Sequence, residues 1–168
     1  MDKNETKAYE ILDKLNISYK RFNHGPVATI ADIEEGLKDL KVIHFKNIFL
    51  RNSKGDKHYL LLIDRKKRAN TKELAKIIGS TRLSFASDDR LEKYLGIEPG
   101  AVSPMGLIND RDKEVEVLVD KDLAQYDEVT LHPNVNTASI TISYGSLYKF
   151  LSWSGNKIQY IEIPERTD

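Results

Sequence analysis

The sequence predicts a single domain of the α+β (mixed α/β) class, with a mixed β-sheet against which helices pack. Three observations support this prediction. Strand-like apolar runs alternate with amphipathic helical segments, clusters of Gly, Pro and Asn separate them, and no repeat, linker or low-complexity tract divides the 168 residues. A chain of this length buries roughly 70% of its unfolded surface, which sustains a core without disulfide bonds. We therefore treat residues 1–168 as one unit.

The N-terminal part predicts a helix, a short strand and a second helix. Residues 6–15 carry apolar side chains at helical spacing, and residues 19–22 have the composition of a short strand. Gly25-Pro26 indicates a turn. Thr29 precedes acidic residues in the way that a helix start does, which predicts a helix over residues 31–39.

The rest of the chain predicts strands and helices in alternation. A hairpin loop at residues 52–56 joins the first two of these strands. The predicted strands are residues 46–51, 58–64, 114–119, 128–132, 139–143 and 157–163. The predicted helices are residues 71–78, ending at Gly79, residues 88–95, capped by Asp88 and ending at Gly96, and residues 146–151.

Residues 98–107 stand out because they combine two prolines and two glycines with small side chains. This composition predicts an irregular loop whose backbone a ligand can approach closely. A rigid connector between helix and strand is the other interpretation.

The charges balance over the whole chain, with 26 Lys and Arg against 26 Asp and Glu, but they are unevenly distributed. Residues 41–82 hold 12 Lys and Arg and three Asp and Glu, so the remainder is correspondingly acidic. A basic face of this kind suits a phosphate-bearing partner. Its densest part is the run Arg65, Lys66, Lys67 and Arg68, which predicts either a contact to nucleic acid or a solvated loop after a strand.

Several classes of function are disfavoured. The chain has no Cys, which excludes thiol nucleophiles, thiolate zinc sites and iron–sulfur clusters. It has no GxSxG, HExxH, P-loop or GxGxxG motif, and no apolar run that approaches the roughly 20 residues of a membrane span. We expect no cofactor, no membrane association and a cytoplasmic location.

The four histidines lack the spacing of metal ligands, so we expect no metal site. His58 is expected to be an exposed strand residue, and His24 a turn or packing residue. His132 ends a predicted strand and begins a polar loop, the kind of place from which sites are built. From its neighbourhood alone it is either a capping or core histidine or a site residue.

Three segments carry a resemblance that extends over nearly the whole chain. They are residues 46–51 (KNIFLR), 100–107 (GAVSPMGL) and 132–138 (HPNVNTA). In their order and spacing they resemble the freestanding prolyl-tRNA editing domains of the YbaK/ProX superfamily, and most of all the branch that hydrolyses Ala-tRNA(Pro). The resemblance implies a YbaK-like mixed sheet or partial barrel with packed helices. It also implies hydrolysis of the aminoacyl ester of a mischarged tRNA.

The resemblance also assigns residues. Lys46 is the lysine that engages the acylated 3′ end, and residues 100–104 match the family's GxxxP loop, so Ser103 and Pro104 become substrate-binding residues. We expect backbone N–H groups between Gly100 and Gly106 to stabilise the oxyanion. Four further residues are implied to contact the substrate, with His132 keeping the pocket small: Ile30, Ile33, Asn47 and His132.

This chemistry agrees with the missing catalytic motifs. An aminoacyl ester is already activated, so its hydrolysis needs a positioned water and oxyanion stabilisation more than a strong nucleophile. The expected partners are the acceptor end of tRNA(Pro), held by the run from Arg65 to Arg68, and, as a second candidate, prolyl-tRNA synthetase. Two alternatives stay open: a deacylase for Cys-tRNA(Pro) or another misacylated tRNA, and a non-catalytic tRNA-binding module of the same fold.

Overall fold

The computed structural model of the protein describes residues 2–23 and 43–167. The predicted turn at residues 25–26 and the predicted helix at residues 31–39 lie outside them. Within the described residues the strands form one mixed sheet in the order β1-β7-β6-β2-β3-β5-β8, with β4 paired to β2, which confirms the predicted fold class. The strands are β1 (Lys20–Asn23), β2 (Ile43–Arg51), β3 (His58–Asp64), β4 (Ser84–Phe85), β5 (Val115–Asp120), β6 (Glu128–Leu131), β7 (Ala138–Ser143) and β8 (Ile158–Ile161).

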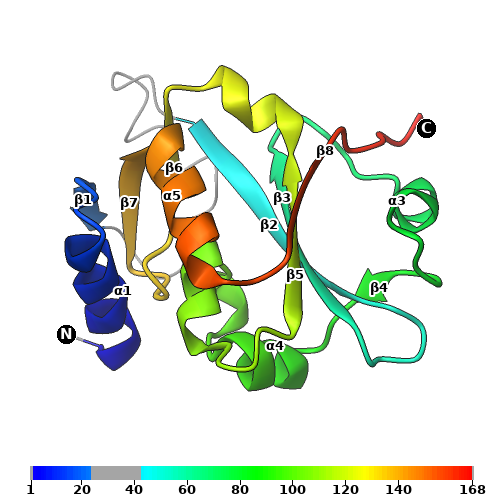
Figure 1. Cartoon of the computed structure of the whole chain (residues 1–168), viewed down its shortest axis with the longest axis horizontal. Coiled ribbons are helices and arrows are strands. Elements are labelled where there is room, and N and C mark those ends of the chain that lie inside the picture. Colours follow the sequence, from blue (N-terminus) through cyan, green and yellow to red (C-terminus); the bar gives the residue numbers. More distant parts are fainter. Residues whose placement is uncertain (1, 24–42, 168) are drawn as a thin grey trace.

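The long strand β2 joins the two halves of the sheet. On one side it pairs antiparallel with β3, which continues in parallel to β5 and then β8. On the other side its first residues pair in parallel with β6, which leads antiparallel to β7 and β1. Figure 1 shows β2 running between these two groups of strands.

Helices cover both faces of the sheet, and this explains why every residue of the central strand β3 is buried. The α-helices are α1 (Lys3–Lys14), α3 (Thr71–Ile78), α4 (Asp88–Leu95) and α5 (Tyr144–Ser154). The larger core contains apolar residues of α1, α4 and α5, whereas the smaller core contains those of α3. Figure 1 shows α3 well separated from the other three helices.

The predicted bounds of α3 and α4 are confirmed, because both helices have strong local end signals. Gly79 and Gly96 end them in the left-handed region, at φ 70° and 63°. The predicted cap of α4 is wrong by one residue. Ser87 is extended and its Oγ accepts a hydrogen bond from the N–H of Arg90 at 3.3 Å, so Asp88 is the first residue of the helix.

His58 is buried, which corrects the expectation of an exposed strand residue. Its ring centroid lies 4.0 Å from that of Tyr94 and 5.5 Å from that of Phe49, and the side chain is 1% exposed. Burial, and secondly the charge of Arg90 3.0 Å away, lower the pKa of His58 to about 4. The first residue of a strand inside a two-sided core packs like the apolar residues that follow it.

The sequence analysis did not predict the short elements. Besides β4, the structure contains the 3₁₀ helices η2 (Pro99–Ala101), η3 (Pro104–Asn109) and η4 (Lys121–Gln125), so the loop predicted at residues 98–107 is partly helical. None of the helices in the described residues is long and apolar enough to span a membrane.

Candidate active site

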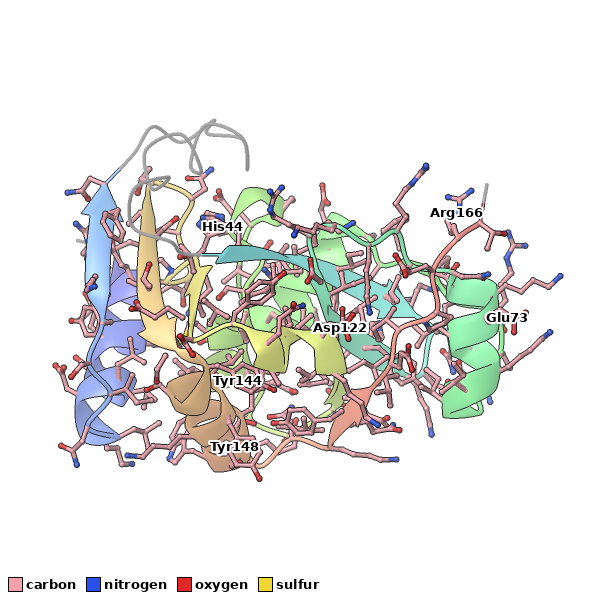
Figure 2. All side chains as sticks on the ribbon, turned by 90° about the horizontal axis from the view of Figure 1, so that it is seen from above. His44, Glu73, Asp122, Tyr144, Tyr148 and Arg166 are labelled. Atoms are coloured by element: carbon pink, nitrogen blue, oxygen red, sulfur yellow. The ribbon has the colours of Figure 1, made fainter. Side chains whose placement is uncertain are left out.

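A pocket opens where β2 separates from its neighbours. On that edge β2 pairs with β6 through Ile43 and His44 and with β4 through Leu50 and Arg51. Between these pairings no strand of the described residues covers the edge, and a cavity of about 290 Å³ lies there. Residues 44–48 of β2, residues 130–132 at the end of β6, and Pro99, Gly100 and Val102 line it. We call this cavity the fork pocket. Figure 2 shows His44 at the start of β2.

Lys46 is the cation of the fork pocket. It lies opposite Ile63 in the β2–β3 pair, and its ammonium donates a hydrogen bond to the main-chain carbonyl of Lys67. Burial, and secondly the positive charge of Arg68, lower the pKa of Lys46, whereas the charge of Asp64 acts in the opposite direction. The strand therefore presents a partly buried ammonium at a pocket that is open to solutes.

Asn47 adds an unsatisfied acceptor. Its Oδ1 is buried and receives no hydrogen bond from any described residue, although the side chain lines the fork pocket. A buried acceptor without a donor is unfavourable, so this amide favours a ligand that brings an N–H or O–H group.

His132 closes the pocket on the side of β6. Its Nδ1 lies 3.1 Å from the carbonyl oxygen of Ala138. Because a carbonyl oxygen only accepts hydrogen bonds, Nδ1 is the protonated nitrogen in this contact. The bond holds the imidazole across the polar loop that joins β6 to β7, which fixes its place at the pocket.

Gly100 is exposed and lies against the same polar loop. A Cβ atom built on Gly100 would be 3.2 Å from Nδ2 of Asn136, a tighter contact than most Cβ atoms make. Glycine therefore allows the segment around η2 to approach the residue 132–138 loop closely.

The structure brings Lys46, Asn47, Gly100 and His132 together, but it places the other loop residues elsewhere. Ser103 caps η3, with its Oγ accepting from the N–H of Met105 at 3.1 Å, and Pro104 is the buried first residue of that helix. The N–H of Gly106 donates to the carbonyl of Ser103 at 3.0 Å. None of these three lines the fork pocket, and Ile30 and Ile33 lie outside the described residues.

The basic run divides into three exposed residues and one buried residue. Arg65, Lys66 and Arg68 are exposed. The Lys67 side chain is only 9% exposed, and its ammonium lies between Asp120 and Asp122. Both interpretations of the basic run, a nucleic-acid contact and a solvated loop, require an exposed side chain, and for Lys67 this expectation is wrong. The ion pairs with these two carboxylates keep the ammonium away from the basic surface.

Sequence reasoning missed two residues that line the pocket and one buried carboxylate outside it. His44 and Thr130 line the pocket and pair with each other between β2 and β6. The sequence does not show which strands pair, so it could not identify these two residues. Asp120 ends an apolar strand and is fully buried, a position at which an acidic residue needs a partner. In residues 2–23 and 43–167, no three His, Asp or Glu side chains are grouped as a metal site.

Known proteins of similar sequence give independent evidence on the family of this chain. A family model described as an aminoacyl-tRNA editing domain matches residues 24–150. The prolyl-tRNA editing protein ProX of Acetoanaerobium sticklandii is 45% identical over 154 residues, which are 90% of this chain and 93% of that protein. The prolyl-tRNA synthetase associated domain-containing protein 1 of Mus musculus is 27% identical over 149 residues, 86% of this chain and 88% of that protein.

A solved structure extends the likeness to the fold. The crystal structure of a candidate trans-editing enzyme for prolyl tRNA synthetase matches with a TM-score of 0.74 at 17% identity, and the match covers 98% of this chain and 99% of that one. The family match spans most of the chain, and the 45% identical relative is covered almost completely. The chain therefore belongs to the family of aminoacyl-tRNA editing domains, in its YbaK/ProX type.

Proposed function

We propose that this protein is a trans-editing deacylase that hydrolyses the aminoacyl ester of mischarged Ala-tRNA(Pro). The observation that carries the proposal is the meeting of Lys46, Asn47, Gly100 and His132 at one pocket, from three separate segments of the chain. The name of the 45% identical relative, a prolyl-tRNA editing protein, supports tRNA(Pro) as the carrier. Charged tRNA is used in the cytoplasm, which is where this activity would act.

The proposed chemistry uses charge and position in place of a nucleophilic side chain. The Lys46 ammonium stabilises negative charge at the ester carbonyl or at the terminal phosphate, and the buried Oδ1 of Asn47 accepts a hydrogen bond from the α-ammonium of the amino acid. The N–H groups of Ala101 and Gly106 already donate to the carbonyls of Glu98 and Ser103. We therefore assign the backbone N–H that stabilises the oxyanion, beside the Lys46 ammonium, to Gly100 and not to Gly106.

Selection against proline follows from volume. One missing group changes the free energy of binding by only about 1–3 kcal/mol, so a synthetase site built for proline cannot exclude alanine well. A second, smaller pocket in the editing protein has the opposite preference: it accepts alanine and excludes proline, which does not fit. We assign the wall of that pocket to His132, and the family resemblance adds Ile30 and Ile33, which lie outside the described residues.

The acceptor end of the tRNA would lie over the basic side of the molecule. Arg65, Lys66 and Arg68 are exposed beside the strand that carries Lys46. Further along, Lys72, Lys76 and Arg82 line a cavity of about 590 Å³ at α3. These side chains offer contacts to phosphates without reading bases. Prolyl-tRNA synthetase is the proposed source of the mischarged tRNA.

The test is deacylation of Ala-tRNA(Pro), Pro-tRNA(Pro) and Cys-tRNA(Pro) side by side, by wild-type protein and by Lys46→Ala and His132→Ala variants. We expect rapid loss of alanine alone, a decrease of about 10²-fold or more in the Lys46→Ala variant, and faster loss of proline in the His132→Ala variant. Preferential loss of cysteine would identify a Cys-tRNA(Pro) deacylase. No loss from any substrate would indicate a tRNA-binding module.

A further inference from the structure

Lys67 lies within the basic run, but its side chain turns into the protein. Its Nζ is 3.0 Å from Oδ1 of Asp120 and 2.8 Å from Oδ2 of Asp122. Asp120 is fully buried, and Asp122 lies on η4, where Figure 2 labels it. We call Lys67, Asp120 and Asp122 the lysine clamp. An ammonium held by two carboxylates is poorly placed to bind a phosphate.

The lysine clamp is joined to the end of β3. Oδ2 of Asp120 accepts from the N–H of Asp64, and Oδ1 accepts from the N–H of Asp122, both at 3.0 Å. The carboxylate of Asp64 in turn accepts from the hydroxyl of Tyr126 at 2.6 Å and from the N–H of Lys66 at 3.0 Å. These bonds fix the backbone of the turn that follows β3.

That turn presents the acceptor for Lys46. The N–H of Lys67 donates to the carbonyl of Asp64 at 3.0 Å, and the carbonyl of Lys67 accepts from the Lys46 ammonium. A lysine has a flexible four-carbon stem, so its ammonium lies where a fixed acceptor holds it. The side chain of Lys67 thus acts on Lys46 through its own main-chain carbonyl.

We propose that Lys67 is a positioning residue for Lys46. The lysine clamp fixes the turn after β3, and the Lys67 carbonyl holds the Lys46 ammonium at the fork pocket. The inference rests on the proposed function, in which Lys46 acts on the ester. It gives Lys67 an effect on the rate of hydrolysis, where the sequence alone predicts an effect on tRNA affinity.

The experiment compares Lys67→Met and Asp122→Asn with two controls. Lys67→Met removes the charge but keeps an unbranched side chain, and Asp122→Asn weakens the clamp at its half-exposed partner. Lys66→Met removes the same charge from the adjacent, exposed position. Ser143→Ala removes the N-cap of α5, and so lowers stability without touching the clamp.

Three quantities are measured for each variant: the single-turnover rate constant on Ala-tRNA(Pro), the Kd of tRNA at several salt concentrations, and the thermal midpoint. We expect Lys67→Met to lower the rate constant by about 10- to 100-fold, since a small misplacement of a catalytic group has effects of this size. Asp122→Asn should lower it less. In both, the Kd and its salt dependence stay close to wild type, whereas Lys66→Met raises the Kd.

Two results would overturn the positioning role. A raised Kd with weaker salt dependence in Lys67→Met, at an unchanged rate constant, would make Lys67 a phosphate contact. If Ser143→Ala loses as much rate as Lys67→Met and the two variants have similar thermal midpoints, lost stability explains the effect of Lys67→Met.

A second readout does not require any activity. In ¹⁵N-lysine NMR, the Lys46 ammonium, assigned with Lys46→Arg, should exchange its hydrogens slowly in wild-type protein and rapidly in Lys67→Met. The same exchange rate in both proteins would refute the positioning of Lys46 by the lysine clamp. If wild-type protein deacylates no substrate but this exchange still responds to Lys67→Met, the proposed function fails and the positioning contact stands.

Discussion

Gly100 lies in η2 and Gly106 in η3, and they are glycines for different reasons. A Cβ on Gly106 would lie 3.0 Å from Cβ of Leu95 and 3.2 Å from its carbonyl oxygen, inside the core, whereas the atoms nearest to a Cβ on Gly100 belong to the side chain of Asn136. Gly106→Ala is therefore expected to lower the free energy of unfolding by about 1–3 kcal/mol. Gly100→Ala should leave stability within about 0.5 kcal/mol of wild type but lower the deacylation rate.

Urea unfolding and single-turnover deacylation of the two glycine variants separate these effects. A stable Gly106→Ala variant with lost activity would reverse the assignment and return Gly106 to the oxyanion site.

His58 predicts a specific dependence of stability on pH. Its pKa is about 4 in the folded protein, below the ordinary histidine value of about 6.5, so the unfolded chain binds the extra proton more readily between these values. The free energy of unfolding should thus fall, by up to roughly 3 kcal/mol, as the pH falls from 6.5 to 4. Below pH 4 this residue adds no further loss.

The matched variant is His58→Phe, which keeps a ring beside Tyr94 but does not titrate. Urea unfolding at several pH values should give a flatter profile for it between pH 6.5 and 4. Parallel profiles for the two proteins would assign the pH dependence to other groups.

At the scale of elements, α4 shows how closely a helix start can be located. The structure makes Ser87 the N-cap and Asp88 the first helical residue. Ser87→Ala should lower the free energy of unfolding by about 1 kcal/mol, through the lost bond to the Arg90 N–H. Asp88→Ala loses only the interaction of its charge with the helix dipole, about 0.3–1 kcal/mol.

Chemical denaturation of both cap variants at neutral pH measures the difference. A larger loss for Asp88→Ala than for Ser87→Ala would restore Asp88 as the cap. High salt is a useful control, because it screens the charge of Asp88 but leaves the Ser87 hydrogen bond in place.

The length of strand β2 determines where the fork pocket lies. It is longer than the predicted strand, since it begins at Ile43, and the first two of the three added residues, Ile43 and His44, pair with β6. The fork pocket exists because this pairing ends after His44 while the strand itself continues.

For the whole molecule, the uneven charge distribution predicts a salt-dependent interaction with tRNA. Changing Arg65, Lys66 and Arg68 together to Gln should weaken tRNA binding and lower the slope of log K against log salt by about 2–3. The control is the triple change of Lys3, Lys7 and Lys14 to Gln, which alters net charge equally. These exposed residues lie on α1, which Figure 1 shows far from α3.

Binding isotherms at four or more salt concentrations measure the slopes of these two triple variants. Equal changes in both would indicate that net charge alone, and not a basic surface beside the site, attracts the tRNA.

Local signals were sufficient for much of the fold. The bounds of α3 and α4 follow from glycines and capping side chains within a few residues of each end, and β3 follows from an unbroken apolar run. The two-residue strand β4 has no such signal, because it exists only through its pairing with β2. The short helix η4 has a capping side chain, Asp120, but it ends at Gln125 without a glycine.

The sequence by itself determined the fold class, the family resemblance and the residue types that meet at the pocket, since these depend on local patterns and on the order of motifs. Only the tertiary structure decided how neighbours in the chain divide their roles. Lys66 and Lys67 are adjacent and chemically alike, yet Lys66 is exposed while Lys67 is buried against Asp120, which lies 53 residues away. A buried ion pair depends on which distant carboxylate the fold brings near, and no local pattern encodes that distance.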